Sequence, residues 1–308
     1  MRIAFLGTPA FAVPSLQALA RAGHELVAVV AQPDRRAGRG QDVREPPTKA
    51  WARENACRVL QPEKIRDGGL SRALAAESPD LLVVVAYGRI LGRDLLELAP
   101  HGAVNVHASL LPRYRGAAPI QWAIAGGEAE TGVTIMQMDE GLDTGHVLLQ
   151  RALPIGEDDA QALSRRLSVL GAEALVEALE LLQAGRIVPV PQDPARATLA
   201  PVLTKDDGRL DFSRPAPRLA DRVRAFRPWP GSFTTIAGRT LKVHAAAPVA
   251  FGDLGPGEAR PTEAGLLVGC GERTALLLLE VQLEGKKRLP AVDFLQGHAV
   301  PAGTVLGP

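Results

Sequence analysis

Cysteine is scarce in this sequence. Its 308 residues include two cysteines, Cys57 and Cys270, which lie far apart and form no CxxC pair. Such sparse cysteines fit a reducing cytosol and argue against a structural zinc site. The six histidines are scattered, without HExxH or similar spacing. We therefore expect a cytoplasmic protein that binds no metal.

Long apolar runs and targeting signals are also missing. No segment approaches the roughly 18–20 consecutive apolar residues that a membrane-spanning helix needs. The chain opens directly on an apolar strand, MRIAFLG, without the pattern of a signal peptide. We expect a soluble globular protein that has no membrane partner.

The motifs of common nucleotide cofactors are absent as well. The turn after the first strand reads GTPAFAVP, which contains one glycine and is not GxGxxG. NAD or FAD binding therefore loses its main sequence signal. Because no GxxxxGK[ST] motif occurs either, ATP or GTP binding by a P-loop is not supported.

Charge is nearly balanced, with 35 Lys and Arg residues against 34 Asp and Glu residues. Residues 191–308 carry 15 basic and 12 acidic residues, a net charge of +3. Residues 1–190 carry the remaining 20 and 22, a net charge of −2. This asymmetry is small, and it matters only where the C-terminal basic residues cluster.

What the sequence does contain is the pattern of an α/β protein. An apolar strand at 3–6, a helical pattern at 10–21 and an apolar strand at 25–31 form a βαβ unit, which implies a parallel sheet. The continuous apolar run at 80–86 is typical of a strand buried on both faces. These features predict a Rossmann-like, mostly parallel sheet.

Changes in pattern suggest the domain boundaries. We expect residues 1–188 to form the α/β domain and residues 189–204, which are rich in proline, to form an extended linker. After it, a helix at 217–226 and several short strands punctuated by glycine and proline follow. Residues 205–308 are therefore expected to form a small OB-like β-barrel.

One stretch, residues 103–145, contains several polar side chains of the kinds that take part in catalysis. Asn105 and His107 are spaced by two at the end of an apolar strand, so they point to the same face. Asp143 follows a second strand and is bracketed by Gly141 and Gly145. Glycine permits backbone conformations that are closed to other residues, so the chain can turn sharply there.

An amide, an imidazole and a carboxylate together form a general acid–base set. Asn105 can donate a hydrogen bond to a developing oxyanion, and His107 can move a proton near neutral pH. Asp143 can fix the tautomer of the imidazole or carry the proton onward. Each residue also has a purely structural interpretation, since an Asn there can cap a strand end and an Asp between glycines can form a turn.

Two longer motifs in this stretch resemble a known family. NVHASLLPRYRGAAPIQ and ETGVTIMQMDEGLDTG are similar to the formyltransferases that use 10-formyltetrahydrofolate. The resemblance runs from RIAFLGTPAFA at the start to AFRPWPGS and GKKR late in the chain. It implies a Rossmann-like formyltransferase domain in which Asn105, His107 and Asp143 are catalytic, with the folate as co-substrate.

The resemblance also implies a reaction. It is closest to members of the family that formylate methionine esterified to initiator tRNA, so initiator methionyl-tRNA is the expected partner and no obligate protein partner is evident. No covalent intermediate is required. A Ser-His-Asp triad that includes Ser109 is not favoured, because the nucleophile elbow GxSxG is absent.

Candidate folate contacts follow from the same resemblance. They are Ser109, Leu110, Leu111 and Pro112 in the first motif, Tyr87, Gly88 and Ile90 after the strand at 80–86, and Asp139 in the second motif. The segment at 87–91 follows the carboxyl end of its strand, where open α/β sheets bind ligands. A simple strand-to-helix turn is the alternative there.

Candidate tRNA contacts lie in two regions. The basic segment 33–47 has no apolar periodicity and is expected to be a flexible inserted loop. A solvated surface loop is the plain interpretation, whereas the resemblance implies that Arg39, with Arg35 and Arg36, reaches the tRNA acceptor arm. The C-terminal domain adds further candidates for phosphate contacts, namely Lys205, Arg218, Arg222, Lys286, Lys287 and Arg288.

Two other functions remain open. One is a folate-dependent formyltransferase that acts on a small amine, such as a sugar nucleotide or glycinamide ribotide. The basic loop and the barrel domain argue against it. The other is a non-catalytic tRNA-binding protein, against which the presence of all three polar site residues argues.

Overall fold

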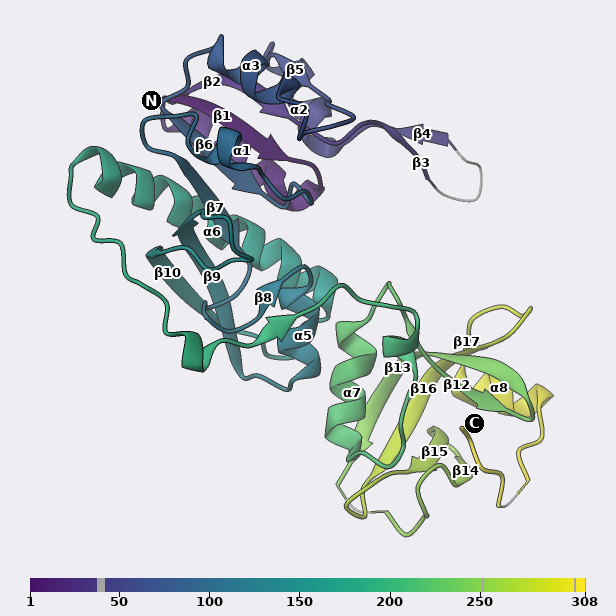
Figure 1. Cartoon of the computed structure of the whole chain (residues 1–308). Helices are drawn as coiled ribbons and strands as arrows, with labels where there is room; N and C mark the ends of the chain where they lie inside the picture. Colours follow the sequence, from purple (N-terminus) through teal and green to yellow (C-terminus); the bar gives the residue numbers. More distant parts are fainter. Residues whose placement is uncertain (38–41, 251, 302, 308) are drawn as a thin grey trace. The chain divides into compact units, whose positions relative to one another are not determined.

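The structure is a computed structural model, and it describes residues 1–37, 42–250, 252–301 and 303–307 (Figure 1). The chain forms two compact units that are not consecutive along the sequence. The first comprises Met1–Pro119, Glu130–Pro154 and Ser164–Pro201. The second comprises Ile120–Ala129, Ile155–Leu163 and Val202–Pro308.

A seven-stranded sheet forms the first unit, in the order β10-β9-β7-β6-β1-β2-β5. Its strands are β1 (Arg2–Gly7), β2 (Glu25–Val30), β5 (Val59–Leu60), β6 (Leu81–Val85), β7 (Ala103–His107), β9 (Glu130–Gln137) and β10 (Val147–Pro154). The five strands from β5 to β7 in this order pair in parallel, and β9 and β10 pair antiparallel. The predicted Rossmann-like, mostly parallel sheet is confirmed.

The order of the sheet explains where a ligand site can form. The chain builds outward from β1 to β2 and β5 and then returns to place β6 and β7 on the other side of β1. Open α/β sheets bind ligands beyond the carboxyl ends of the strands near such a reversal. All five residues of β6 are buried, as its continuous apolar run predicts.

Helices cover the sheet of the first unit. They are α1 (Val13–Arg21), α2 (Pro47–Glu54), α3 (Gly69–Ala75), α4 (Arg93–Leu96), and the long α6 (Ala160–Gln183), part of which belongs to the second unit. Gly171 of α6 lies so close to β7 and β9 that a Cβ there would sit 2.8 Å from the Val106 side chain. This glycine therefore allows α6 to approach the sheet closely.

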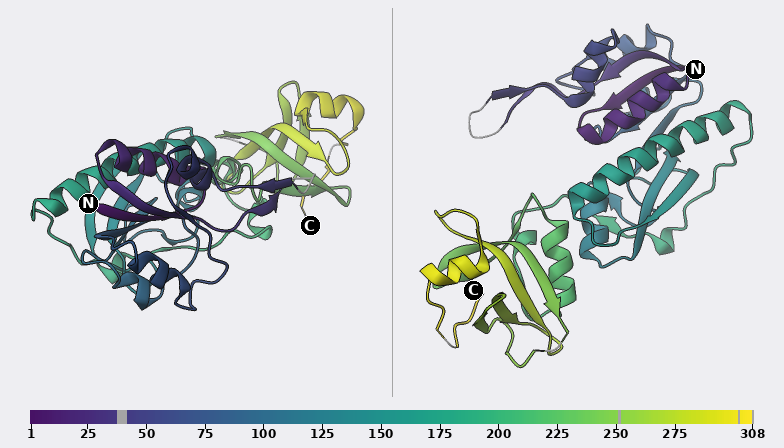
Figure 2. Two further views of the ribbon diagram at one scale, coloured as in Figure 1. Left: turned by 90° about the horizontal axis from the view of Figure 1, so that it is seen from above. Right: turned by 180° about the vertical axis from the view of Figure 1, so that it is seen from behind.

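The basic segment expected to be a flexible loop contains a hairpin. β3 (Arg35–Ala37) pairs antiparallel with β4 (Asp42–Arg44), and Figures 1 and 2 show this hairpin projecting from the edge of the first unit. The sequence does not indicate this hairpin, because each of its strands is only three residues long and contains a single apolar residue, Ala37 or Val43, which is too few for an alternating pattern. Residues 38–41, which include Arg39, lie outside the described residues.

The second unit is built around an antiparallel sheet in the order β12-β13-β16-β15-β14, with β17 paired to β16. Its strands are β12 (Ser232–Ile236), β13 (Arg239–Val249), β14 (Ala259–Thr262), β15 (Gly265–Gly269), β16 (Ala275–Leu283) and β17 (Leu289–Pro290). Two helices, α7 (Ala216–Ala225) and α8 (Ala291–Gly297), lie against it (Figure 1). Leu219 and Val223 of α7 enter its core, as predicted from the spacing of apolar residues.

The C-terminal segment links the two ends of this sheet. The amide of Ala259 in β14 donates to the carbonyl of Thr304, and the amide of Gly307 donates to Thr235 in β12. The sheet thus curls toward closure through irregular backbone. The OB-like barrel remains our interpretation of this arrangement.

Two segments from before residue 188 belong to the second unit, where α7 holds them. The guanidinium of Arg224 donates to the carbonyls of Gly156 and Asp158, at 2.8 Å each. Trp122, in α5 (Pro119–Ala125), meets Phe226 edge to face at 5.8 Å between ring centroids. None of the helices in the described residues is long and apolar enough to cross a membrane.

Candidate active site

Two of the predicted catalytic residues lie on β7. Asn105 pairs with Val84 of β6 and Met136 of β9, and His107 ends the strand at its carboxyl edge. Their spacing places both side chains on one face of the sheet. The Asn105 side chain is half-buried and forms no hydrogen bond with any other described residue. Its amide is therefore available to a ligand oxygen.

The ring of His107 is oriented by backbone. It is 6% exposed, and its Nε2 lies 2.9 Å from the carbonyl oxygen of Tyr114. Because a carbonyl only accepts, Nε2 carries the hydrogen, and Nδ1 is the acceptor of the neutral ring. Nδ1 faces Oδ2 of Asp143 at 3.7 Å, which is too long for a hydrogen bond. The Tyr114 carbonyl thus fixes the tautomer, a role that the sequence had suggested for Asp143.

Asp143 itself adopts the unusual backbone conformation. Its φ of 52° is left-handed, whereas Gly141 and Gly145 lie outside that region. The expectation that the two glycines supply this conformation is wrong. Gly145 is needed because a Cβ would lie 1.8 Å from the carbonyl oxygen of Gln137. The amide of Gly116 donates to Oδ2 of Asp143 at 2.8 Å and holds the carboxylate near His107.

Left-handed backbone occurs on both sides of the imidazole. Tyr114, which binds Nε2, has a φ of 60°, and Asp143 faces Nδ1. A non-glycine residue in this region carries a cost of about 1–3 kcal/mol that the surrounding structure must offset. Asp143 and Tyr114 therefore depend on surrounding hydrogen bonds, such as those with Gly116 and Thr198, to keep this conformation.

The loop after β7 is pinned to β9 and β10 by buried polar groups. Ser109 is fully buried, and its hydroxyl donates to the carbonyl of Arg113 at 2.6 Å. Thr134 donates to the Ser109 carbonyl and accepts from the amide of Leu111, and Gln150 donates to the Leu111 carbonyl. The Ser109 hydroxyl therefore stabilises the conformation of the loop, and this arrangement gives no support to a serine nucleophile.

The predicted folate contacts differ in exposure. The side chains of Ser109 and Leu111 are buried, and those of Leu110 and Pro112 are half-buried. Tyr87 is 1% exposed and its ring lies in the core, so only its backbone can face a ligand. These positions can supply backbone donors and acceptors, but their side chains largely support the loops.

The remaining three folate candidates are exposed. Gly88 follows Tyr87, and Ile90 is 66% exposed. Asp139 is also exposed, and its Oδ1 accepts from the amide of Gly141 and the hydroxyl of Thr144. Asp139 therefore shapes the turn that leads to Asp143.

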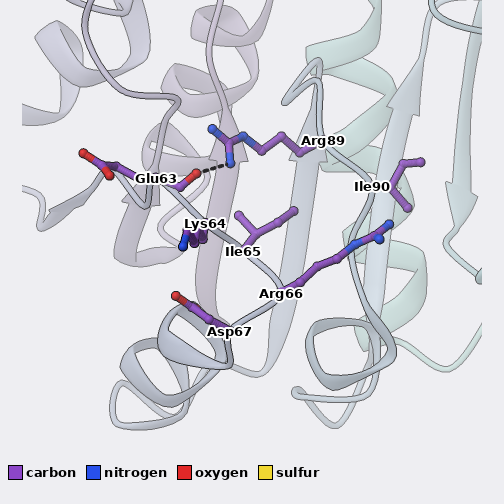
Figure 3. Close-up of a pocket in the computed structure, with 7 residues that line it drawn as sticks. All are labelled: Glu63, Lys64, Ile65, Arg66, Asp67, Arg89 and Ile90. Carbon is purple, nitrogen blue, oxygen red and sulfur yellow. Dashed lines mark hydrogen bonds between the residues drawn. The ribbon is translucent and has the colours of Figure 1, made fainter.

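Ile90 lies in a pocket of about 590 Å³ in the first unit (Figure 3). The lining residues are Glu63, Lys64, Ile65, Arg66, Asp67, Arg89 and Ile90. Arg89 donates to the carbonyl of Glu63 at 2.7 Å, and Arg66 extends toward Ile90. The lining thus combines apolar side chains with three cationic and two acidic ones, so its charge is mixed.

The base of the hairpin is connected to this region. Gln32 donates from Nε2 to the carbonyl of Tyr87 at 2.8 Å and accepts from the guanidinium of Arg35 at 2.6 Å. Arg35 is otherwise exposed. The predicted contacts Arg39 and the side chain of Arg36 lie outside the described residues. One glutamine therefore joins the Tyr87 segment to the foot of the arginine hairpin.

The predicted tRNA contacts on α7 and before it are mostly engaged within the second unit. Arg218 donates to the carbonyl of Gly126. Arg222 donates to the carbonyl of Asp207 at 2.6 Å, and burial lowers the pKa of its guanidinium. Lys205 is exposed. Arg222 is thus largely a structural cation, which the amphipathic pattern of α7 could not distinguish.

The GKKR cluster forms the turn between β16 and β17. Lys286 and Lys287 are exposed. Arg288 pairs with Glu280, whose carboxylate raises the pKa of the guanidinium. The cluster therefore presents two exposed lysines beside one partly neutralised arginine.

Several residues around the site carry no sequence signal. Tyr114 acts through its carbonyl, and Gln32 and Gln192 act through side-chain amides in segments predicted to be loop or linker. A single glutamine in such a segment has no periodicity or motif that indicates a role. Among the described residues, no group of three or more His, Cys, Asp and Glu side chains is placed to hold a metal ion.

Comparison with known families places this arrangement in a class. Residues 1–179 match the family described as "Formyl transferase", and residues 202–299 match "Formyl transferase, C-terminal domain". The chain belongs to the formyl transferase family.

Full-length relatives narrow the class further. A methionyl-tRNA formyltransferase of Anaeromyxobacter dehalogenans (strain 2CP-C) is 66% identical over 304 residues, which cover 96% of this chain and 97% of the relative. One from Koribacter versatilis (strain Ellin345) is 53% identical over 309 residues, covering 100% and 99%. Within the family, the chain thus groups with methionyl-tRNA formyltransferases.

Solved structures share the fold at lower identity. An N-formyltransferase from Helicobacter canadensis, solved with folinic acid and dTDP-3-aminofucose, is similar with a TM-score of 0.68 and 17% identity, over 90% of this chain and 98% of that one. HypX from Aquifex aeolicus, solved with tetrahydrofolic acid, gives a TM-score of 0.61 at 19% identity, over 96% and 47%. At these identities the likeness concerns the fold alone.

Proposed function

We propose that this chain transfers the formyl group of 10-formyltetrahydrofolate to the α-amino group of methionyl initiator tRNA, for translation initiation in the cytoplasm. The observation that carries the proposal is the placement of Asn105 and His107 on one face of β7, with the carboxylate of Asp143, from the loop between β9 and β10, 3.7 Å from the His107 ring. The full-length relatives named methionyl-tRNA formyltransferase support the choice of substrate. Alternatives that act on a small amine or only bind tRNA are not favoured.

The folate co-substrate supplies the formyl group. The residues of the site stabilise the negative charge that develops on the formyl oxygen and transfer the proton of the amine. The amide of Asn105 donates a hydrogen bond to the formyl oxygen as negative charge develops there. His107 accepts the proton of the attacking amine at Nδ1 and releases it toward the departing nitrogen. Asp143, at 3.7 Å from Nδ1, stabilises the imidazolium while the Tyr114 carbonyl keeps the ring oriented.

The residues present fit a folate. A flat pterin requires an apolar wall with backbone donors and acceptors, which Gly88, Ile90 and the loop at 109–112 offer. The half-buried Asn105 amide, which lacks a partner among the described residues, is an available donor on the strand that leads into the loop at 109–112. Asp139 takes part by shaping the second loop.

The tRNA is assigned to the basic surfaces. Arg39, with Arg35 and Arg36, is proposed to contact the acceptor end; of these, Arg35 and Arg36 lie on β3 of the projecting hairpin. Lys286 and Lys287 are proposed to hold phosphates of the tRNA body, with smaller contributions from Arg288 and Arg218 because their guanidinium groups have partners in the second unit. We retain residues 1–188 as the catalytic region, 189–204 as the linker and 205–308 as the tRNA-binding region.

A label-transfer experiment tests the proposal. Purified protein is incubated with formyl-labelled 10-formyltetrahydrofolate and either charged initiator tRNA, a sugar-nucleotide amine or glycinamide ribotide. We expect label on the methionyl-tRNA and none on the small amines. Label on a small amine alone would support the alternative formyltransferase, and tight tRNA binding without any transfer would support the non-catalytic alternative.

A further inference from the structure

The segment expected to be an interdomain linker reaches the candidate active site through one side chain. Oε1 of Gln192 accepts from Nε of Arg115 at 3.0 Å and from a terminal nitrogen of the same guanidinium at 2.7 Å. Nε2 of Gln192 donates to the carbonyl of Asp143 at 2.9 Å and to the carbonyl of Gly145 at 2.8 Å. All four residues belong to the first compact unit.

These contacts use the whole amide. A glutamine amide has two N–H donors and one carbonyl oxygen with two acceptor positions, and each of them is occupied here. The amide is half-buried, so both donors face carbonyls in a site partly withdrawn from water. A side chain saturated in this way has one preferred orientation.

The contacts also close a ring around the carboxylate. Gln192 holds the backbone of Asp143, and the amide of Gly116 holds its Oδ2 at 2.8 Å. Gly116 directly follows Arg115, whose guanidinium returns to Gln192. Because Asp143 sits in a left-handed conformation with a φ of 52°, its position depends on such external restraints.

Attachment of the segment does not depend on this glutamine. The amides and carbonyls of Val190 and Val147 exchange two hydrogen bonds, at 2.8 and 2.9 Å. Further along, β11 (Leu199–Ala200) pairs in parallel with β8 (Arg115–Gly116). Substitution of Gln192 should therefore leave residues 189–204 in place and alter its hydrogen bonds to Asp143, Gly145 and Arg115, which restrain the loop that carries Asp143.

We infer that Gln192 is a positioning residue for catalysis: it sets the Asp143 carboxylate opposite Nδ1 of His107 without touching the substrate. This inference rests on the proposed function, because it assigns Asp143 its role in proton transfer. It also means that the linker completes the catalytic unit as well as joining the two units.

Gln192→Glu tests the inference with little change in size. It keeps an oxygen acceptor for Arg115 but replaces the two donors with an oxygen that faces the carbonyls of Asp143 and Gly145. A misplacement of about 1 Å can cost about 10²-fold in rate, so we expect kcat for formyl transfer to fall about 10–100-fold. The KM for 10-formyltetrahydrofolate and the melting temperature should stay near those of the unmodified protein.

Gln183→Glu, at the exposed end of α6, is the matched control and should leave kcat unchanged. Gln192→Ala is the second variant if Gln192→Glu fails to fold. It introduces no charge and should show a smaller loss, again in kcat. In an Asp143→Asn background, Gln192→Glu should cost little more, because residues that act through one another are not additive.

Three results would overturn the positioning role: a folded Gln192 variant with kcat within about twofold of the unmodified protein, a loss confined to KM, or a full additional loss in the Asp143→Asn background. A different result, no formyl transfer to methionyl-tRNA by the unmodified protein, would remove the proposed function and this inference with it.

Discussion

The negative charge of Asp143 can be removed with little change in the size or conformation of the side chain. Asparagine tolerates left-handed backbone and keeps an oxygen that can accept from Gly116. Asp143→Asn therefore preserves the loop and removes the negative charge that faces His107. We expect kcat to fall about 10²-fold or more, as for other proton-transfer groups, with little change in melting temperature. Rates near those of the unmodified protein would mean that the carboxylate is a loop brace and has no role in proton transfer.

The folding stability of the second unit should depend on pH through His244. Burial lowers the pKa of this histidine, which lies on β13 beside Gln282. Because the unfolded state binds the proton more readily, the stability contributed by neutral His244 is complete above about pH 6.5 and is lost as the pH falls below it.

Thermal melts between pH 8 and pH 5 check this expectation. His244→Gln should flatten the loss of melting temperature at acid pH, whereas His101→Gln, at an exposed position, should follow the unmodified protein. Parallel curves for the unmodified protein and His244→Gln would contradict the role assigned to burial.

Among the elements, the hairpin β3–β4 has the most direct consequence for function. Arg39→Ala should reduce turnover of methionyl-tRNA far more than folate affinity, because the resemblance to the family assigns this arginine to the tRNA acceptor arm and none of the proposed folate contacts lies in the basic segment 33–47. Steady-state kinetics with each substrate varied in turn measure the two effects. Arg21→Ala, at the end of α1, removes one exposed cation elsewhere and is the control. Equal losses for tRNA and folate would place the hairpin at the folate site instead.

Elements with strong periodicity could be predicted, and those formed by backbone pairing or long-range contact could not. The strands at the centre of the sheet, α6 and α7 follow from apolar runs and stripes. β3, β4 and β14 are short and polar or contain proline, so no alternation indicates them. Asn105 and His107 could be placed from strand spacing, whereas Gln192 approaches Asp143 only through tertiary folding.

At the scale of the whole molecule, the second unit is expected to bind tRNA through phosphates. Each phosphate contact that releases counterions contributes about −0.7 to −0.9 to the slope of log affinity against log salt. Lys286→Glu with Lys287→Glu should weaken binding and make this slope shallower. Initiator and elongator tRNAs should be affected alike, because phosphates carry no sequence information.

Arg21→Glu with Arg165→Glu reverses two exposed charges on helices of the first unit and serves as the control for charge. If this control changes the salt slope as much as the lysine pair does, binding follows net charge and the β16–β17 turn has no specific role. An unchanged slope for the lysine pair would assign the phosphate contacts to other residues.

The compact units also show why domain boundaries are hard to predict from composition. Residues 120–129 and 155–163 precede the proline-rich segment, yet they belong to the second unit, where Arg224 and Phe226 contact them. Those contacts join residues that are 68 positions apart in one case and about a hundred in the other. No local sequence pattern indicates contacts at such separations. The linker is likewise tied to the first unit through Val190 and Gln192.

Single-turnover formyl transfer tests the central claim most directly. Enzyme in excess over charged initiator tRNA, with saturating 10-formyltetrahydrofolate, reports the chemical step without product release. We expect rapid formylation by the unmodified protein and rates about 10²–10⁴-fold lower for Asn105→Ala and His107→Ala, with folate affinity retained. Absence of transfer by the unmodified protein, or an undiminished rate for folded His107→Ala, would contradict the account.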